Sequence, residues 1–317
     1  MDEMALSETG GAPLSPMINN KILSLYTRGL SSTEIQDHFR NNYHVHMPLP
    51  LLRSTTDSVL SDYQSWQGSA LERQYPIVYF DSLMVRFRAG KDNRNHTVLF
   101  ALGIDMQGQK RPLGLWVTAN EGRPAWQLVM TELKQRGVND IFIACLYGQT
   151  GVREALARSF PQSQAQLCVV RLIDNSLDFV AWKDRKEAAA ALRVVYTSNT
   201  ATVAADAMTR FMCDCDEHYP AISQLWHAQW DQLTGLFMLP LPLREAIYST
   251  NAIQSLHQSL AKVSKRHGIF TDENELLVRL YLAQHYLARR WSQPLRHWKQ
   301  VLNCLAITYD NRLQFKS

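Results

Sequence analysis

The spacing of hydrophobic residues changes near Tyr75, and this change fixes the order of elements that the chain can form. Before Tyr75, in residues 18–26, apolar side chains recur at about 3.6 residues, the period of an amphipathic helix. After it come three β-rich segments in a row, 77–87, 96–104 and 113–117, joined by glycine-containing connections. The sequence therefore predicts a helical unit followed by an antiparallel meander.

Helices and strands alternate after the meander. Helices are expected at 124–136 and 152–160, and apolar strands at 141–146 and 165–170. The resulting order, β-β-β-α-β-α-β-α, predicts an α/β fold with a mixed sheet and helices on its faces. This is the ribonuclease H-like order of elements.

The residues before the sheet predict three helices, at about 18–28, 33–39 and 51–66. Gly29 ends the first helix, and Ser31 or Ser32 caps the second, with Glu34 available for a capping box. This outline matches a helix-turn-helix unit, in which the third helix would read the major groove. Three-helix units also occur in proteins that do not bind DNA.

The rest of the chain is predicted to be helical. Residues 174–241 show no convincing strand, and Trp182, Trp226 and Trp230 are assigned to the core of a helical insertion. Residues 251–263 predict a helix with one apolar stripe. The predicted organisation is a flexible tail at 1–16, a helix-turn-helix-like DNA-binding unit at 17–70, the first part of the core at 75–180, the helical insertion at 181–243 and the C-terminal helices of the core at 244–317.

Composition excludes several classes of protein. With 46% hydrophobic and 20% charged residues the chain is globular, and no apolar run is long enough to span a membrane. Five cysteines, an odd number in a long chain, indicate reduced intracellular thiols. The segment 213–218 resembles a metal site, but only Cys215 and His218 would share a helix face, so we expect no zinc there. The net charge of +4 permits a nucleic-acid partner without implying one.

Asp81 is the first candidate for catalysis, because it lies inside an apolar strand where a lone carboxylate is costly. A hydrogen-bonded structural aspartate is the commoner explanation for such a residue. Two-metal phosphodiester chemistry would need carboxylates on the first strand, the fourth strand and a later helix, because Mg²⁺ prefers oxygen ligands.

From about Met17 to Thr308, the chain closely resembles the Mutator-type bacterial insertion-sequence transposases. The resemblance is carried by a set of short stretches in order: Tyr75–Val85, Leu99–Asp105, Leu113–Trp116, Asn120–Gly122, Trp126, Glu132–Val138, Ile143–Cys145, Gln166–Cys168, Asn175–Leu177, Trp182–Lys186, Tyr219–Pro220 and Thr250–Ile253. It implies a ribonuclease H-like core with a helical insertion and an acidic triad. It also implies binding to terminal inverted repeats and Mg²⁺-dependent cleavage.

The departures from the family pattern fall on the catalytic positions. The resemblance places the second triad Asp at Tyr147 and the Glu at Gln254, so Asp81 is the remaining triad acid. The family's Cys-x-x-His element ends here in Arg171, and His257 replaces an Asn. A single carboxylate should not hold two Mg²⁺ ions, so we expect no resident metal or cofactor, and Mg²⁺ only if some activity remains.

Candidate DNA-binding residues lie in two places. On the third predicted helix these are Arg53, Ser54 and Thr55, after leucines that are poor base readers. The second group, Lys262, Lys265 and Arg266, would contact phosphates near the active-site DNA, as the resemblance implies.

Three hypotheses follow. The first is a transposase-family protein that binds double-stranded DNA and has lost strand cleavage. The second is an active enzyme with relocated ligands drawn from Asp105, Glu121 or Asp140. The third is a protein-interaction or dominant-negative subunit that does not bind DNA. The resemblance also implies a homo-oligomer in the bacterial cytoplasm, associated with the nucleoid and not with a membrane.

Overall fold

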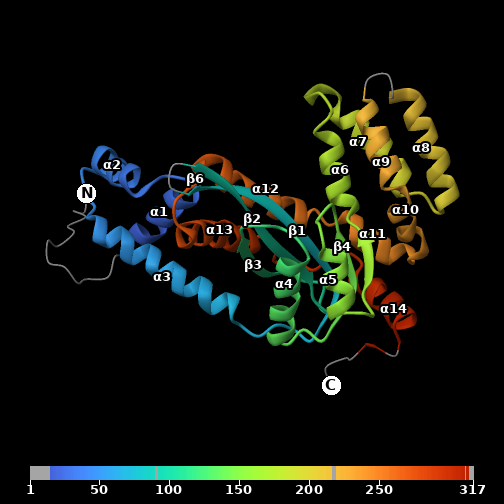
Figure 1. Ribbon diagram of the computed structural model, residues 1–317, viewed down its shortest axis with the longest axis horizontal. Coiled ribbons are helices and arrows are strands. Elements are labelled where there is room, and N and C mark those ends of the chain that lie inside the picture. Colours follow the sequence, from blue (N-terminus) through green and yellow to red (C-terminus); the bar gives the residue numbers. More distant parts are fainter. Residues whose placement is uncertain (1–14, 90–91, 216–218, 311, 314–317) are drawn as a thin grey trace. The chain divides into compact units, whose positions relative to one another are not determined.

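The computed structural model describes residues 15–89, 92–215, 219–310 and 312–313, so most of the predicted tail at 1–16 lies outside the described residues. Its strands are β1 (Gln74–Ala89), β2 (Asp92–Ile104), β3 (Lys110–Thr118), β4 (Asp140–Leu146), β5 (Gln164–Leu167) and β6 (Ile269–Phe270) (Figure 1). Its α-helices and 3₁₀ helices, the latter labelled η, are α1 (Pro16–Thr27), α2 (Ser32–Tyr43), α3 (Leu49–Gln67), α4 (Arg123–Gln135), α5 (Val152–Ser159), α6 (Val169–Leu177), η1 (Trp182–Asp184), α7 (Arg185–Tyr196), α8 (Ala201–Cys215), α9 (Pro220–Ala228), α10 (Trp230–Thr234), η2 (Gly235–Met238), α11 (Leu241–Ser249), α12 (Ala252–His267), α13 (Glu273–Ala288) and α14 (Trp298–Thr308).

The strands form one six-stranded mixed sheet. Its order is β3-β2-β1-β4-β5, and β6 pairs with β1 off this path. Strands β2 and β3 are antiparallel, whereas β4 runs parallel to both β1 and β5. The predicted α/β class with a mixed sheet is therefore confirmed.

The two faces of β1 are covered by different helices. Val78 and Phe80 share a hydrophobic core with Trp126 of α4 and Leu156 of α5. Tyr79 points the other way, and its hydroxyl donates to the carbonyl of Ile247 in α11 at 2.9 Å. Side chains alternate along a strand, so Asp81 shares the α11 face with Tyr79.

Most local predictions agree with the structure. Ser31 caps α2, and Glu34 completes the capping box. The predicted stripe on α12 is entirely buried, and it consists of Ile253, Leu256, Leu260 and Val263. Burial of one face explains why this polar sequence folds as a helix here.

Two predictions were wrong. The strand expected at 165–170 ends at Leu167, and Val169 begins helix α6, because a short apolar run fits a strand or a buried helix equally well. Trp182 is not in the core: its side chain is 85% exposed, in η1. Trp226 is fully buried, as expected.

Contacts divide the chain into two compact units. The first unit comprises residues 1–69, 84–96 and 258–287, and the second comprises 70–83, 97–257 and 288–317. In the first unit, α1, α2 and α3 share one hydrophobic core with Val278 and Leu282 of α13. The N-terminal helices are therefore packed on a helix from near the other end of the chain.

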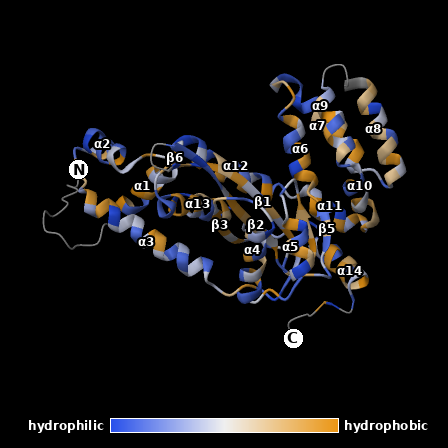
Figure 2. Cartoon of the chain, viewed as in Figure 1, coloured by the Kyte–Doolittle hydropathy of each residue, from blue (hydrophilic) through white to orange (hydrophobic). Residues whose placement is uncertain are grey.

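Hydropathy follows these cores. In Figure 2 helices α1 and α3 carry both orange and blue residues, as expected of helices with one buried side. In the described ranges, no helix combines the length and the apolar character needed to cross a lipid bilayer.

Candidate functional site

The sheet places two of the three triad positions side by side. Strands β1 and β4 are parallel, and Tyr79 is opposite Cys145 in their register. Two residues further along each strand are Asp81 and Tyr147, which therefore meet where β4 ends. The site belongs entirely to the second unit.

The carboxylate of Asp81 is buried and has two partners on its first oxygen. Oδ1 accepts hydrogen bonds from the backbone N–H of Ser82 at 2.8 Å and from Gln149 Nε2 at 3.2 Å. The orientation of the Gln149 amide is fixed because its oxygen accepts the backbone N–H of Tyr147 at 2.7 Å. Gln149, in the loop after β4, thus donates a hydrogen bond to Asp81 on the neighbouring strand β1.

The second oxygen of Asp81 also has two partners. His257 Nδ1 and Arg171 Nε both lie 2.9 Å from Oδ2. The Arg171 contact is an ion pair without hydrogen-bond alignment, since its buried Nε–H has no aligned acceptor. Arg171 Nη2 lies 3.3 Å from His257 Nε2, and because arginine can only donate, Nε2 accepts and Nδ1 carries the proton.

Helix α6 presents the guanidinium to this carboxylate. Arg171 stands in its first turn, and Arg171 Nη1 donates to Asp174 Oδ2, one helical turn further on, at 2.7 Å. Asp174 Oδ1 accepts from Gln254 Nε2 of α12 at 2.7 Å. A single guanidinium therefore bridges two carboxylates, and Gln254 reaches the same cluster.

Tyr147 contacts α6 as well. Burial raises the pKa of the Tyr147 phenol, while a hydrogen bond with Asn175 and the charge of Arg171 act in the opposite direction. The phenol is protonated and neutral at pH 7. The structure thus brings Asp81, Tyr147 and Gln254 together around one polar surface of α6.

The three alternative acids lie in different places. Glu121 is near Asp81: its carboxylate accepts from Ser82 Oγ at 3.4 Å and from Trp126 Nε1 at 3.2 Å. Burial is the main cause that raises the pKa of Glu121, and the charge of Asp81 adds to it.

Asp105 and Asp140 lie at the opposite end of β1. Asp140 is in register with Gln74, seven residues before Asp81, or about 23 Å along an extended strand. Asp140 pairs with Arg312 and Asp105 with Arg111. Gly103, two residues before Asp105 on β2, packs against the ring of Tyr75 at the start of β1. This contact places Asp105 at the same end of β1 as Asp140.

Other metal-ligand chemistry finds little support in the described ranges, which contain no group of three or more His, Cys, Asp or Glu side chains suited to a metal ion. Burial raises the pKa of Cys168 to about 12, and that of Cys145 well above its usual value, so both thiols stay protonated. His218, of the metal-like segment 213–218, lies outside the described residues.

The candidate DNA-binding residues all belong to the first unit. Arg53 and Ser54 are exposed on α3, whereas Thr55 is buried and its hydroxyl donates to the carbonyl of Leu51. Exposed on the last two turns of α12 are the three cations Lys262, Lys265 and Arg266. Burial therefore excludes Thr55 as a DNA contact, whereas the other five candidates are exposed.

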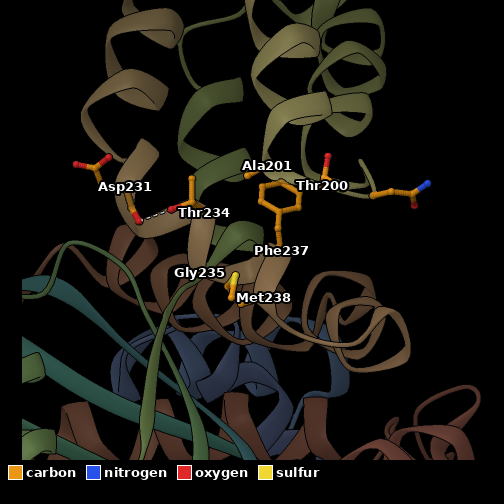
Figure 3. A pocket seen from close by; sticks show the side chains of 8 residues that line it. Thr200, Ala201, Asp231, Thr234, Gly235, Phe237 and Met238 are labelled. Carbon is orange, nitrogen blue, oxygen red and sulfur yellow. Dashed lines mark hydrogen bonds between the residues drawn. The ribbon is translucent and has the colours of Figure 1, made fainter.

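A separate pocket lies within the helical insertion, away from Asp81. Figure 3 shows its lining, which includes Phe237, Met238 and Asp231. The hydroxyl of Thr234 donates to the carbonyl of Asp231 at 2.8 Å and is therefore already used within the chain. The polar groups of this pocket do not converge as those around Asp81 do.

Sequence reasoning singled out Asp81 but missed what holds it. Asp174 was not a candidate, and Arg171 was noted only as a lost histidine. The signal was present in the sequence. Arg171 is a cation at a position where the family motif has histidine, and Asp174 follows it three residues later, which is the spacing of an ion pair on a helix. The strand predicted over 165–170 hid that spacing.

Comparison with known proteins agrees with the resemblance in the sequence. The model of the family described as "Transposase, Mutator family" matches residues 15–294. The chain is 36% identical to the transposase for insertion sequence element ISRM3 of Rhizobium meliloti, over 94% of this chain and 74% of that protein. It is 33% identical to a probable insertion-sequence transposase of Corynebacterium diphtheriae, over 93% of this chain and 92% of the relative.

Proposed function

Because the chain belongs to the Mutator family of transposases, we propose that it is a DNA-binding member of that family that has lost strand-cleavage chemistry. The observation that carries the proposal is the environment of Asp81. Three donors from the protein hydrogen bond to its two oxygens, and the Arg171 guanidinium lies in ion-pair contact with Oδ2. A carboxylate offers about four lone-pair positions, so three are used, and a permanent cation beside Oδ2 disfavours a metal ion there.

Charge leads to the same proposal. Two carboxylates, Asp81 and Asp174, face one permanent cation, Arg171. The guanidinium offsets one of the two negative charges and would repel a dication bound to the same carboxylates. Mg²⁺ therefore fits these residues poorly, and the guanidinium takes its place as the cation that faces the two acids.

The neutral substitutions are consistent with this arrangement. Gln254 donates to Asp174, which a glutamate at that position could not do while ionised. Tyr147 contributes a neutral phenol where the family has an acid. The substituted residues belong to one connected network. This supports a stably rearranged site in preference to a random loss of catalytic residues.

We further propose a ribonuclease H-like topology for the sheet. The support is the order β3-β2-β1-β4-β5, in which β4 and β5 run parallel to β1. Family membership supports double-stranded DNA as the partner, a homo-oligomeric state and action in the bacterial cytoplasm on the nucleoid. The helix-turn-helix function of α1–α3 belongs to the same proposal.

Glu121 favours one alternative, an active enzyme with a relocated ligand, because its carboxylate lies near Asp81. That alternative would require Arg171 to leave the carboxylate it contacts. Trp182 favours another, a protein-interaction subunit, because its large apolar ring is exposed.

A paired assay separates these functions. The purified protein is mixed with labelled duplex DNA to measure binding, and with supercoiled plasmid plus Mg²⁺ or Mn²⁺ to measure nicking. We expect binding without nicking. Nicking that Asp81→Ala abolishes would show an active enzyme, and absence of binding to any duplex would favour the protein-interaction function.

A further inference from the structure

The guanidinium of Arg171 directs all three of its nitrogens at the candidate site. Nε lies 2.9 Å from Asp81 Oδ2, Nη1 donates to Asp174 Oδ2 at 2.7 Å, and Nη2 lies 3.3 Å from His257 Nε2. The side chain is only 9% exposed, so little of it reaches solvent. The positive charge is therefore fixed between the two acids.

The ion pair with Asp174 holds this guanidinium in place. Both residues belong to α6 and are three positions apart, the spacing at which side chains on a helix meet. A metal ion at Asp81 would have to move the guanidinium away from that carboxylate. Because the arginine side chain is enclosed, the displaced cation would stay buried and lose one of its two acidic partners, which is costly.

The two positions at which the resemblance places acids lie beside the same guanidinium. Tyr147 follows β4 next to Asp81, and the charge of Arg171 acts on its phenol. Gln254 Nε2 donates to Asp174 Oδ1 at 2.7 Å, while Arg171 holds the other oxygen of that carboxylate. An acid restored at either position would therefore lie close to the guanidinium, and pairing with it would compete with the binding of a metal ion.

We propose that Arg171, more than the missing acids at positions 147 and 254, keeps divalent cations out of this site. Restoring both acids is then not sufficient for metal binding, and removing the positive charge at position 171 is necessary. This inference rests on the proposed loss of strand-cleavage chemistry and identifies the residue that maintains that loss.

The experiment measures Mn²⁺ binding by electron paramagnetic resonance in three variants that all carry Tyr147→Asp and Gln254→Glu. The first keeps Arg171. The second adds Arg171→Gln, which removes the charge and leaves a polar side chain. The third adds Arg171→Lys, the matched control, which keeps the positive charge. Adding Asp81→Asn to each variant measures the binding that does not depend on the site, and circular dichroism with thermal unfolding establishes that every variant folds.

We expect Asp81-dependent binding of Mn²⁺ only in the variant with Arg171→Gln. Its affinity should exceed that of the other two by at least about tenfold, the lower end of the effect that residues around metal ligands have on metal affinity.

A second comparison applies if the restored acids prevent folding. Arg171→Gln and Arg171→Lys are then compared in the otherwise wild-type protein, where Mn²⁺ should raise the melting temperature of the first and not of the second. An equal response of the two single variants would overturn the inference.

Four results in the main experiment would also overturn it, and they can be told apart. Equal binding with Arg171 kept and with Arg171→Gln would show that the acids alone were missing. Equal binding with Arg171→Lys and Arg171→Gln would show that charge is not the cause. Absence of binding in all three variants would show that the site excludes the ion for another reason. In these three cases the proposed function stands, whereas stoichiometric binding by the wild type that requires Asp81 would contradict both.

Discussion

Arg171 in the second unit and Arg279 in the first unit are both buried, but their surroundings differ. Arg279 is fully buried, donates through Nε and Nη2 to Glu275, and donates to the carbonyls of Tyr26 and Leu30. Its guanidinium also lies 4.0 Å from the ring centroid of Tyr26. Every part of this arginine has a partner that holds α13 against α1.

Arg171 is less well accommodated. Its Nε lies in ion-pair contact with Asp81 without an aligned hydrogen bond, and Nη2 faces a histidine nitrogen at 3.3 Å. The two acids around it come from β1 and from α6 itself. A buried arginine alone thus says little about function: Arg279 is part of the scaffold, whereas Arg171 lies between Asp81 and Asp174 at the candidate site.

The largest effect is expected from Arg279→Ala. Removing this side chain takes a donor from each of the carbonyls of Tyr26 and Leu30 and takes the guanidinium from Glu275, which should cost about 3–5 kcal/mol of unfolding free energy. Urea unfolding measures it. A loss below about 1 kcal/mol would show that Arg279 is not needed for the scaffold.

Arg171→Ala should cost less, about 1–3 kcal/mol, because Asp81 keeps three other donors. The variant should also gain a response that the wild type lacks, since two carboxylates then face an empty space. Millimolar Mn²⁺ should raise its melting temperature, with about 2.7 kcal/mol gained at an ion concentration of 100 times Kd.

Arg279→Ala is the matched control for that response, because it also removes a buried guanidinium but leaves only one carboxylate behind. It should show no stabilisation by Mn²⁺. An equal response of both variants, or of neither, would remove the distinction between the two arginines.

Tyr147→Phe tests a weaker link of the same network. It removes the hydrogen bond between the phenol and Asn175 and leaves the ring in place. We expect a loss of about 1 kcal/mol, measured by urea unfolding. A larger loss than that of Arg171→Ala would mean that the phenol, and not the guanidinium, organises the site.

The smallest effect concerns pH. Burial raises the pKa of Glu121 above its usual 4.5, so the folded protein holds this proton more tightly than the unfolded chain. The stability that this proton contributes is present below pH 4.5 and is lost as the pH rises through the raised pKa. Glu121→Gln should therefore become more stable relative to the wild type as the pH rises from acid to neutral, measured by melting temperature. A constant difference would contradict the pKa shift.

The elements that surround the site were predictable because hydrophobic period is a local property. The stripe of α12 and the capping box at Ser31 and Glu34 could both be read directly. The site was only half predictable. Asp81 stands out as a polar residue in an apolar strand, but its partner Arg171 lies 90 positions further along the chain. Local patterns carry no information on such a contact, and the apolar run at 167–170 concealed the start of the helix that creates it.

We propose that the Arg171 guanidinium takes the position of a metal ion at Asp81. Mn²⁺ titration followed by electron paramagnetic resonance measures it most directly, since bound and free ions give different signals. The wild-type protein should bind no more Mn²⁺ than Asp81→Asn does. Stoichiometric Mn²⁺ binding that disappears in Asp81→Asn would contradict the account.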